Sequence, residues 1–353
     1  MSYKNENMKM IELHENGLDI RFRIRENGVV ELADFSSQEV KKAIMEPKED
    51  ICYPAVEIHR SGTGSLNMHA YKNNINQSSV DFVYENHELK EQDGGKELEI
   101  VMVSPEKLKA VYHMRLFDGV PAVQTWTEII NEGSEDQGLT YVSSFMYQGI
   151  SRGGEKPYYK KTDIYVPFNS WCCEAQWQKY DAETLNLNGM VVDGFNHQGY
   201  GLNRYCYSGK GTWSTCEYLP MGIAEDRETG ETYIFQIESS GQWLAEYGSA
   251  QGGNLYLALS GATEQEHGWY KNLKPGESFT TVPAGVAVVK GGLNPVAAAL
   301  TTILFTIYRE SGTQKLLAIC PSWIKLFHVG FLTKIRGGKI KISSSGLNAE
   351  ETA

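Results

Sequence analysis

The feature that most constrains this fold is the alternation of apolar and polar residues, with a period of two, across most of the first 300 positions. Ile20–Ile24 reads IRFRI, and Leu98–Val103 reads LEIVMV. Leu108–Leu116 (LKAVYHMRL) and Ala122–Ile130 (AVQTWTEII) repeat the pattern over longer stretches. Such alternation is typical of antiparallel strands that bury one face and expose the other. The sequence therefore predicts a succession of strands joined by turns.

Helical periodicity is scarce by comparison. The segments Glu39–Met45 and Pro295–Tyr308 (PVAAALTTILFTIY) are the two helix candidates. Many short strands with few helices indicate an all-β sandwich. Because the strands extend over nearly 300 residues, we expect an unusually large sandwich of two antiparallel sheets, followed by a short C-terminal helix.

Charge and composition narrow the range of partners. The chain has 353 residues and a net charge of −11. Nucleic acids and anionic membranes require concentrated Lys and Arg, so the charge argues against both as partners. The N-terminal segment MSYKNENMKMIELHENG lacks an apolar signal-peptide core, and no apolar run reaches the roughly 18 residues of a membrane span. Six cysteines without a C-x-x-C pair indicate no disulfide framework in a chain of this length, so we expect a reduced, cytoplasmic protein.

Composition changes sharply near the C-terminus. No acidic residue occurs between Ser311 and Ala349, a stretch that contains six basic residues: Lys315, Lys325, Lys334, Arg336, Lys339 and Lys341. One interpretation is a basic element that binds a partner. The interpretation we favour is a truncated or shifted reading frame, whose residues were never selected to pack. It predicts a poorly ordered tail after about Tyr308.

Several motifs between Tyr165 and Thr302 occur in a characteristic order. The two most specific are W-x-x-E-x-Q-W, at Trp171–Trp177, and L-x-P-G-E-x-F-x-T, at Leu273–Thr281. The accompanying segments are Gly211–Pro220 (GTWSTCEYLP), Thr232–Ser240 (TYIFQIESS), Gln242–Glu246 (QWLAE) and Asn294–Thr302 (NPVAAALTT). In this order they resemble the N-terminal domain of glycoside hydrolase family 36, whose best-known members are α-galactosidases. The resemblance extends from about Ile11 to Thr302 and is weakest at its start.

The resemblance implies a β-supersandwich similar to galactose-mutarotase-like domains. It implies a sandwich domain over residues 1–300, then a linker helix and an aberrant basic tail over 301–353. In the family a catalytic barrel with two catalytic Asp residues follows the sandwich. One Asp belongs to a K-W-D-type strand end and the other to a later Asp-containing strand end, and neither motif occurs in this sequence. Retaining hydrolysis needs two carboxyl groups about 5–5.5 Å apart on one rigid face. Because the strands that carry them in the family have no counterpart in this sequence, we assign no catalytic residue. We expect an accessory domain that supports barrel packing, oligomerisation and the shape of the substrate pocket, without hydrolytic activity by itself.

Trp171, Glu174 and Trp177 are the candidate substrate-binding residues. An indole face stacks on the apolar face of a sugar, and a carboxylate accepts hydrogen bonds from sugar hydroxyls. The resemblance makes an α-galactoside the expected ligand. The alternative is that both tryptophans pack in the core and that Glu174 caps a turn.

Three other tryptophans, one glutamate and two Gly-rich segments also bear on a ligand role. Trp213, Trp243 and Trp269 are expected to pack in the core or between domains, and Glu246 is a candidate polar anchor. The Gly-rich segments His59–His69 and Asp193–Gly201 are candidate ligand loops, because function concentrates on loops. Histidines with H-x-x-x-H spacing do not occur, so we predict neither a metal nor a cofactor.

Two further functions stay open at this point. The chain is a free-standing carbohydrate-binding module if the sandwich alone retains sugar affinity. It is a mutarotase-like sugar epimerase if a His acid and a Glu base lie in the concave face of a sheet, in which case His113 is the candidate acid. The linear sequence shows no Glu at a matching spacing, and likeness of fold alone transfers no chemistry.

Overall fold

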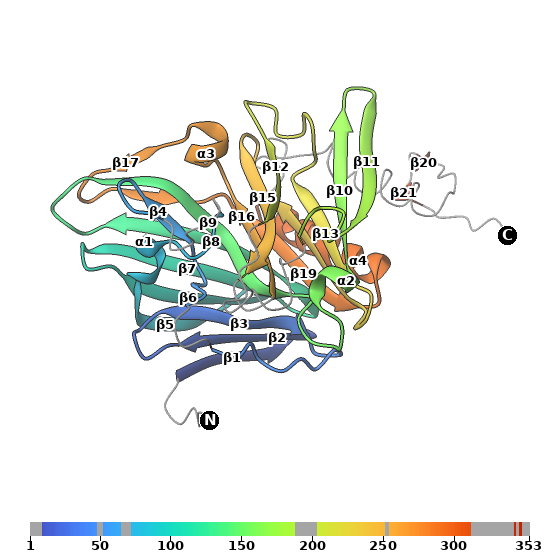
Figure 1. Cartoon of the computed structure of the whole chain (residues 1–353), viewed down its shortest axis with the longest axis horizontal. Helices are drawn as coiled ribbons and strands as arrows, with labels where there is room; N and C mark the ends of the chain where they lie inside the picture. Colours follow the sequence, from blue (N-terminus) through green and yellow to red (C-terminus); the bar gives the residue numbers. More distant parts are fainter. Residues whose placement is uncertain are drawn as a thin grey trace, which may run out of the picture.

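The computed structural model describes residues 9–47, 52–64, 72–187, 203–250, 254–311, 342–343 and 346–347. Within these ranges the chain is mostly strand, and every strand pairing is antiparallel. Two large sheets and one three-stranded sheet make up the body (Figure 1). The predicted all-β class and the large antiparallel sandwich are confirmed.

The larger sheet has ten strands, in the order β11-β10-β13-β14-β19-β8-β7-β6-β5, with β18 paired to β8. The bounds of these strands are β5 Val83–Gln92, β6 Gly95–Val103, β7 Leu108–Phe117, β8 Val120–Asn131, β10 Thr162–Ser170, β11 Cys173–Asp181, β13 Met221–Asp226, β14 Glu231–Ile237, β18 Ser278–Thr280 and β19 Ala284–Lys290. The hairpin of β10 and β11 projects from the body at one end of this sheet (Figure 1).

The second sheet has six strands, in the order β12-β15-β16-β9-β17, with β4 paired to β9. Their bounds are β4 Ile58–Arg60, β9 Gln137–Ile150, β12 Arg204–Gly209, β15 Trp243–Ala250, β16 Asn254–Ser260 and β17 Lys271–Leu273. A three-stranded sheet of β1 Lys9–Glu15, β2 Leu18–Ile24 and β3 Val30–Ser37 packs beside both, and β20 Ile342–Ser343 pairs with β21 Gly346–Leu347.

One apolar core joins these sheets. It takes alternate residues of the predicted strands, such as Ile100 on β6 and Tyr112 on β7, together with residues of β2, β3 and β9. Phe35 on β3 contacts the ring of Phe145 on β9 edge to face, with ring centroids 5.5 Å apart. Because the same core includes side chains from all three sheets, the strands up to β19 form one packed body.

Helix α4, Leu293–Ser311, forms a second layer outside the ten-stranded sheet. Its buried residues Val296 and Leu300 share an apolar cluster with Ile234 on β14 and Val289 on β19. The predicted C-terminal helix is therefore confirmed, and it is longer than the predicted segment. It also runs across the expected boundary between residues 300 and 301.

The register of β6, β7 and β8 places three side chains in a row on the outer face of the same sheet. Glu99 on β6 is the direct partner of His113 on β7, and His113 is the direct partner of Trp126 on β8. The β7–β8 connection turns at Gly119, which has a φ of 71° and so suits a residue without a Cβ.

The prediction of a helix over Glu39–Met45 is wrong. The segment forms a turn and then irregular backbone, because Lys41 has a φ of 51°, in the left-handed region. This path brings the buried ammonium of Lys42 into contact with the carboxylate of Glu231. Three unpredicted one-turn helices occur elsewhere: α1 Gln77–Val80, α2 Tyr158–Lys161 and α3 Glu264–His267.

Two expectations fall mainly outside the described residues. Most of the tail after Ser311, and the whole Asp193–Gly201 loop, belong to ranges that the structure does not describe. Among the helices in the described ranges, none is both long and apolar enough to traverse a bilayer.

Candidate functional site

The predicted tryptophan cluster lies at the tip of the β10–β11 hairpin. Trp171 occupies the turn and is 79% exposed. Its ring meets the ring of Trp213 edge to face, with centroids 6.3 Å apart and an interplanar angle of 76°. Trp213 is itself 50% exposed. The structure thus brings together two solvent-facing indoles, one of which was expected to be packed.

Glu174 and Trp177 lie in different environments from Trp171. Glu174 is exposed, and its carboxylate accepts a hydrogen bond of 3.1 Å from the backbone N–H of Cys172 in the turn. Trp177 is half-buried and packs against the apolar cluster beneath α4. Trp177 and Glu174 therefore lie as the packing alternative describes, whereas Trp171 is exposed at the hairpin tip.

The other two tryptophans pack as expected. Trp243 is fully buried, and its Nε1 donates a 2.7 Å hydrogen bond to the carbonyl of Ser214. Trp269 packs on Phe279, with ring centroids 5.1 Å apart. Trp213 differs because it follows the turn after β12 rather than lying in a strand.

Glu246 has the contacts of the polar anchor that the sequence suggested. Its buried carboxylate accepts hydrogen bonds from the backbone N–H and the side-chain amide of Asn73, at 2.9 and 2.8 Å. It also pairs with Arg204 at 2.7 Å and accepts the hydroxyl of Tyr256. All of these contacts are to other groups of the protein. Glu246 therefore fixes the backbone around Asn73 against strand β15 of the six-stranded sheet.

His59, at the start of the predicted His59–His69 loop, lies in β4. It is buried, and its ring packs on Tyr141 with centroids 4.7 Å apart. Burial lowers the pKa of His59 to about 3, so the ring is neutral at physiological pH. His59 is therefore a core residue, and positions 65–71, which include the other histidine of that loop, lie outside the described residues.

Glu57, two residues earlier, is also fully buried. Its carboxylate accepts hydrogen bonds from the backbone N–H of Ile75 at 2.5 Å and of Asn76 at 3.2 Å, and from the hydroxyl of Ser79 at 2.6 Å. Burial raises the pKa of Glu57 to about 7, although these hydrogen bonds act in the opposite direction. The three donors belong to residues that are themselves buried, so these contacts are structural.

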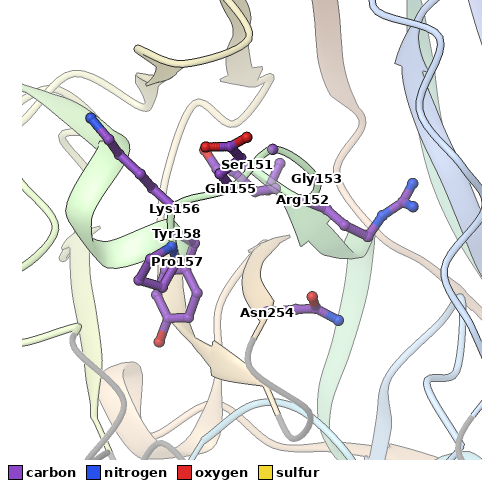
Figure 2. Close-up of a pocket in the computed structure, with 10 residues that line it drawn as sticks. Ser151, Arg152, Gly153, Glu155, Lys156, Pro157, Tyr158 and Asn254 are labelled. Atoms are coloured by element: carbon purple, nitrogen blue, oxygen red, sulfur yellow. The ribbon is translucent and has the colours of Figure 1, made fainter.

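A cavity of about 350 Å³ lies between the end of β9, the loop that leads to α2, and Asn254 at the start of β16. Its charged side chains do not converge: in Figure 2 those of Arg152 and Lys156 point in different directions, away from Tyr158. Arg152 instead pairs with the buried Asp34 at 2.9 Å, and the hydroxyl of Tyr158 donates to the carbonyl of Leu187 at 2.7 Å. Because binding sites need a few convergent polar groups, we assign this cavity no ligand.

His113, the candidate epimerase acid, has two carboxylates beside it that sequence spacing did not reveal. Its Nδ1 lies 2.8 Å from Glu97 Oε1 and 3.8 Å from Glu99 Oε1. The signal was present as Glu97-x-Glu99, because residues two apart in a strand share a face. His113 is hydrogen-bonded to Glu97, and neither residue lines the cavity described above, so the structure adds no observation that favours the epimerase hypothesis.

Comparison with known proteins identifies the fold. No family model and no curated protein matches the sequence. Among solved structures, the GH36 α-galactosidase AgaA from Geobacillus stearothermophilus is similar at a TM-score of 0.61 and 14% identity, over 82% of this chain and 42% of that chain. The α-galactosidase from Lactobacillus brevis is similar at a TM-score of 0.61 and 14% identity, over 85% and 42% of the two chains.

This chain has the fold of one part of the GH36 α-galactosidases. The galactosidase domain of the α-galactosidase-sucrose kinase AgaSK gives the same result, with a TM-score of 0.61 and 14% identity over 84% of this chain and 43% of that one. The chain therefore spans 42–43% of the length of each of these three structures. This coverage is consistent with the N-terminal domain that the motifs indicated.

Proposed function

We propose that this chain provides the accessory β-sandwich domain of a GH36-type α-galactosidase and supports the packing of a catalytic barrel. The observation that carries the proposal is the coverage: the shared fold includes 82–85% of this chain but only 42–43% of the enzymes. The proposal keeps residues 1–300 as the sandwich and 301–353 as linker helix and tail. It also includes a cytoplasmic location and assembly with further copies.

Hydrolysis of an α-galactoside tests the proposal directly. The purified 353-residue chain is assayed on p-nitrophenyl α-galactoside, with an intact GH36 α-galactosidase as the positive control. We expect no release of nitrophenol above the buffer rate, because the two catalytic carboxylates belong to the barrel in this proposal. Turnover that co-purifies with the chain through a second column would overturn it.

A second candidate function, sugar binding by the sandwich itself, is favoured by the exposed Trp171–Trp213 pair. Two indoles at an interplanar angle of 76° offer an aromatic face for the C–H groups of a sugar ring. The carboxylate of Glu174 lies at the same hairpin tip and is exposed. Solved AgaA variants hold raffinose and stachyose, which makes these sugars the natural probes.

Calorimetric titration with raffinose tests this second function. Trp171→Ala and Trp213→Ala should each weaken binding by roughly fivefold, because stacking on an aromatic ring contributes on the order of 1 kcal/mol. Tyr270→Ala is the matched control, since Tyr270 is 54% exposed and lies on a different loop. Equal affinity in wild type and both tryptophan variants, or the absence of binding at millimolar raffinose, contradicts the assignment.

A further inference from the structure

We infer that Glu97, Glu99 and His113 form a binding site for a divalent transition-metal ion, with Zn²⁺ as the best-matched ion. Each residue offers one ligand atom, and these atoms lie within 4.8 Å of one another. Within this set, His113 Nδ1 is 2.8 Å from Glu97 Oε1 and 3.8 Å from Glu99 Oε1. A cation between them would replace the hydrogen bond that now links His113 to Glu97.

The strand register explains why the three ligands meet. Glu97 and Glu99 lie two residues apart on β6 and therefore project from the same face of the sheet. His113 on β7 is the direct cross-strand partner of Glu99. Paired neighbours of this kind have Cβ atoms about 5 Å apart, which suits side chains that share one ion.

Each ligand is also oriented by a side chain outside the triad. The second oxygen of Glu97 accepts a hydrogen bond from Gln92 at 2.6 Å, and the second oxygen of Glu99 pairs with Lys90 at 2.6 Å. The His113 ring stacks on Trp126 with centroids 4.8 Å apart and an interplanar angle of only 8°. Such outer partners fix the direction of metal ligands in proteins. Here they leave the Oε1 atom of each carboxylate directed toward His113.

Charge and donor type favour Zn²⁺ over the hard cations. Ca²⁺ and Mg²⁺ prefer sites made wholly of oxygen, whereas an imidazole with carboxylates suits Zn²⁺ and its neighbours. The two carboxylates carry two negative charges, of which the ammonium of Lys90 offsets part. Lys90 also lies 3.7 Å from Glu88, so its charge is shared with a carboxylate outside the site. The side chains of His113 and Glu99 are 13% and 21% exposed, which leaves the fourth position to water.

Zinc titration of the full chain tests the site. The protein is stripped with EDTA, exchanged into chelator-free buffer and titrated with ZnCl₂ in a calorimeter. We expect the wild type to bind one more Zn²⁺ than His113→Gln or Glu97→Gln, or to bind it at least tenfold more tightly. The visible spectrum of the Co²⁺-loaded protein should lose the bands of one tetrahedral site in the same variants.

His14→Gln is the matched control. His14 also has two carboxylates nearby, Asp19 at 2.7 Å and Glu12 at 3.7 Å, but these face opposite ring nitrogens and cannot meet on one ion. Its zinc stoichiometry should equal that of the wild type. Circular dichroism without metal checks that each variant folds. If His113→Gln does not fold, Glu97→Gln still tests the site, because it keeps the size of the side chain. Unchanged zinc binding in the folded triad variants overturns the assignment.

Discussion

The buried carboxyl of Glu57 couples the stability of this protein to pH. Burial raises its pKa from 4.5 to about 7, so the folded state holds a proton that the unfolded chain releases. The stability that this proton contributes is complete below about pH 4.5 and is lost as the pH rises toward 7. His59 acts in the opposite direction, because its lowered pKa makes the fold lose stability as the pH falls below 6.5.

A comparison of wild type with Glu57→Gln isolates the contribution of Glu57. The difference in unfolding free energy between the two proteins should decrease by about 3 kcal/mol from pH 4.5 to pH 8, at roughly 1.4 kcal/mol per pKa unit. Urea unfolding at several pH values measures it. Glu26→Gln, in an exposed turn, is the control and should show no such trend. A difference that stays constant with pH would show that Glu57 is ionised in the fold throughout this range.

At the scale of single residues, the sequence did not indicate the surroundings of the candidate side chains. The W-x-x-E-x-Q-W motif gave no sign that Trp171 lies in a turn whereas Trp177 packs under α4. The partner of Trp171 is Trp213, which is distant in sequence, and their contact depends on how the hairpin sits beside the turn after β12. Solvent exposure of an aromatic residue is decided by tertiary packing, which local pattern does not encode.

Among the elements, α4 makes the most specific energetic prediction. Val296, Ala297, Ala299 and Leu300 are buried against the outer face of the ten-stranded sheet. Leu300→Ala should lower the unfolding free energy by roughly 2–5 kcal/mol, because it removes buried methyl groups and leaves a cavity. Chemical denaturation monitored by circular dichroism measures the loss.

Ala298→Ser is the control for this helix, since Ala298 is exposed on the opposite side. It should change the unfolding free energy by less than about 0.5 kcal/mol. If Leu300→Ala is equally harmless, α4 does not pack on the sheet in solution.

The elements differ in how well the sequence predicted them. Strands such as β7 and β8 were evident because one face is buried and the other is not. The helix at Pro295–Tyr308 was evident because it is long. By contrast, α1, α2 and α3 have four residues each, which is too short for a helical period to appear. Glu39–Met45 looked helical, but the left-handed backbone at Lys41 and the buried contact of Lys42 with Glu231 determine its path.

At the scale of the whole molecule, the order of the motifs predicted the fold, and structural similarity to GH36 α-galactosidases confirms it at only 14% identity. The register between strands was not predictable in the same way. Glu97, Glu99 and His113 meet because the β6–β7 hairpin aligns Glu99 with His113, a relation that no motif records. Sequence reasoning therefore predicted the architecture and missed the cluster of Glu97, Glu99 and His113.

The ten-stranded sheet ends at β5, and the residues of that strand have a consequence for the behaviour of the chain in concentrated solution. A bare strand edge offers unpaired backbone groups to any neighbouring molecule and so seeds aggregation. Strand β5 reads VYENHELKEQ, in which charged and amide side chains predominate and most positions face solvent. We therefore expect the carboxylates that Glu85, Glu88 and Glu91 present along this edge to oppose pairing with a second strand, while Tyr84 N–H already donates to the carbonyl of Gly28.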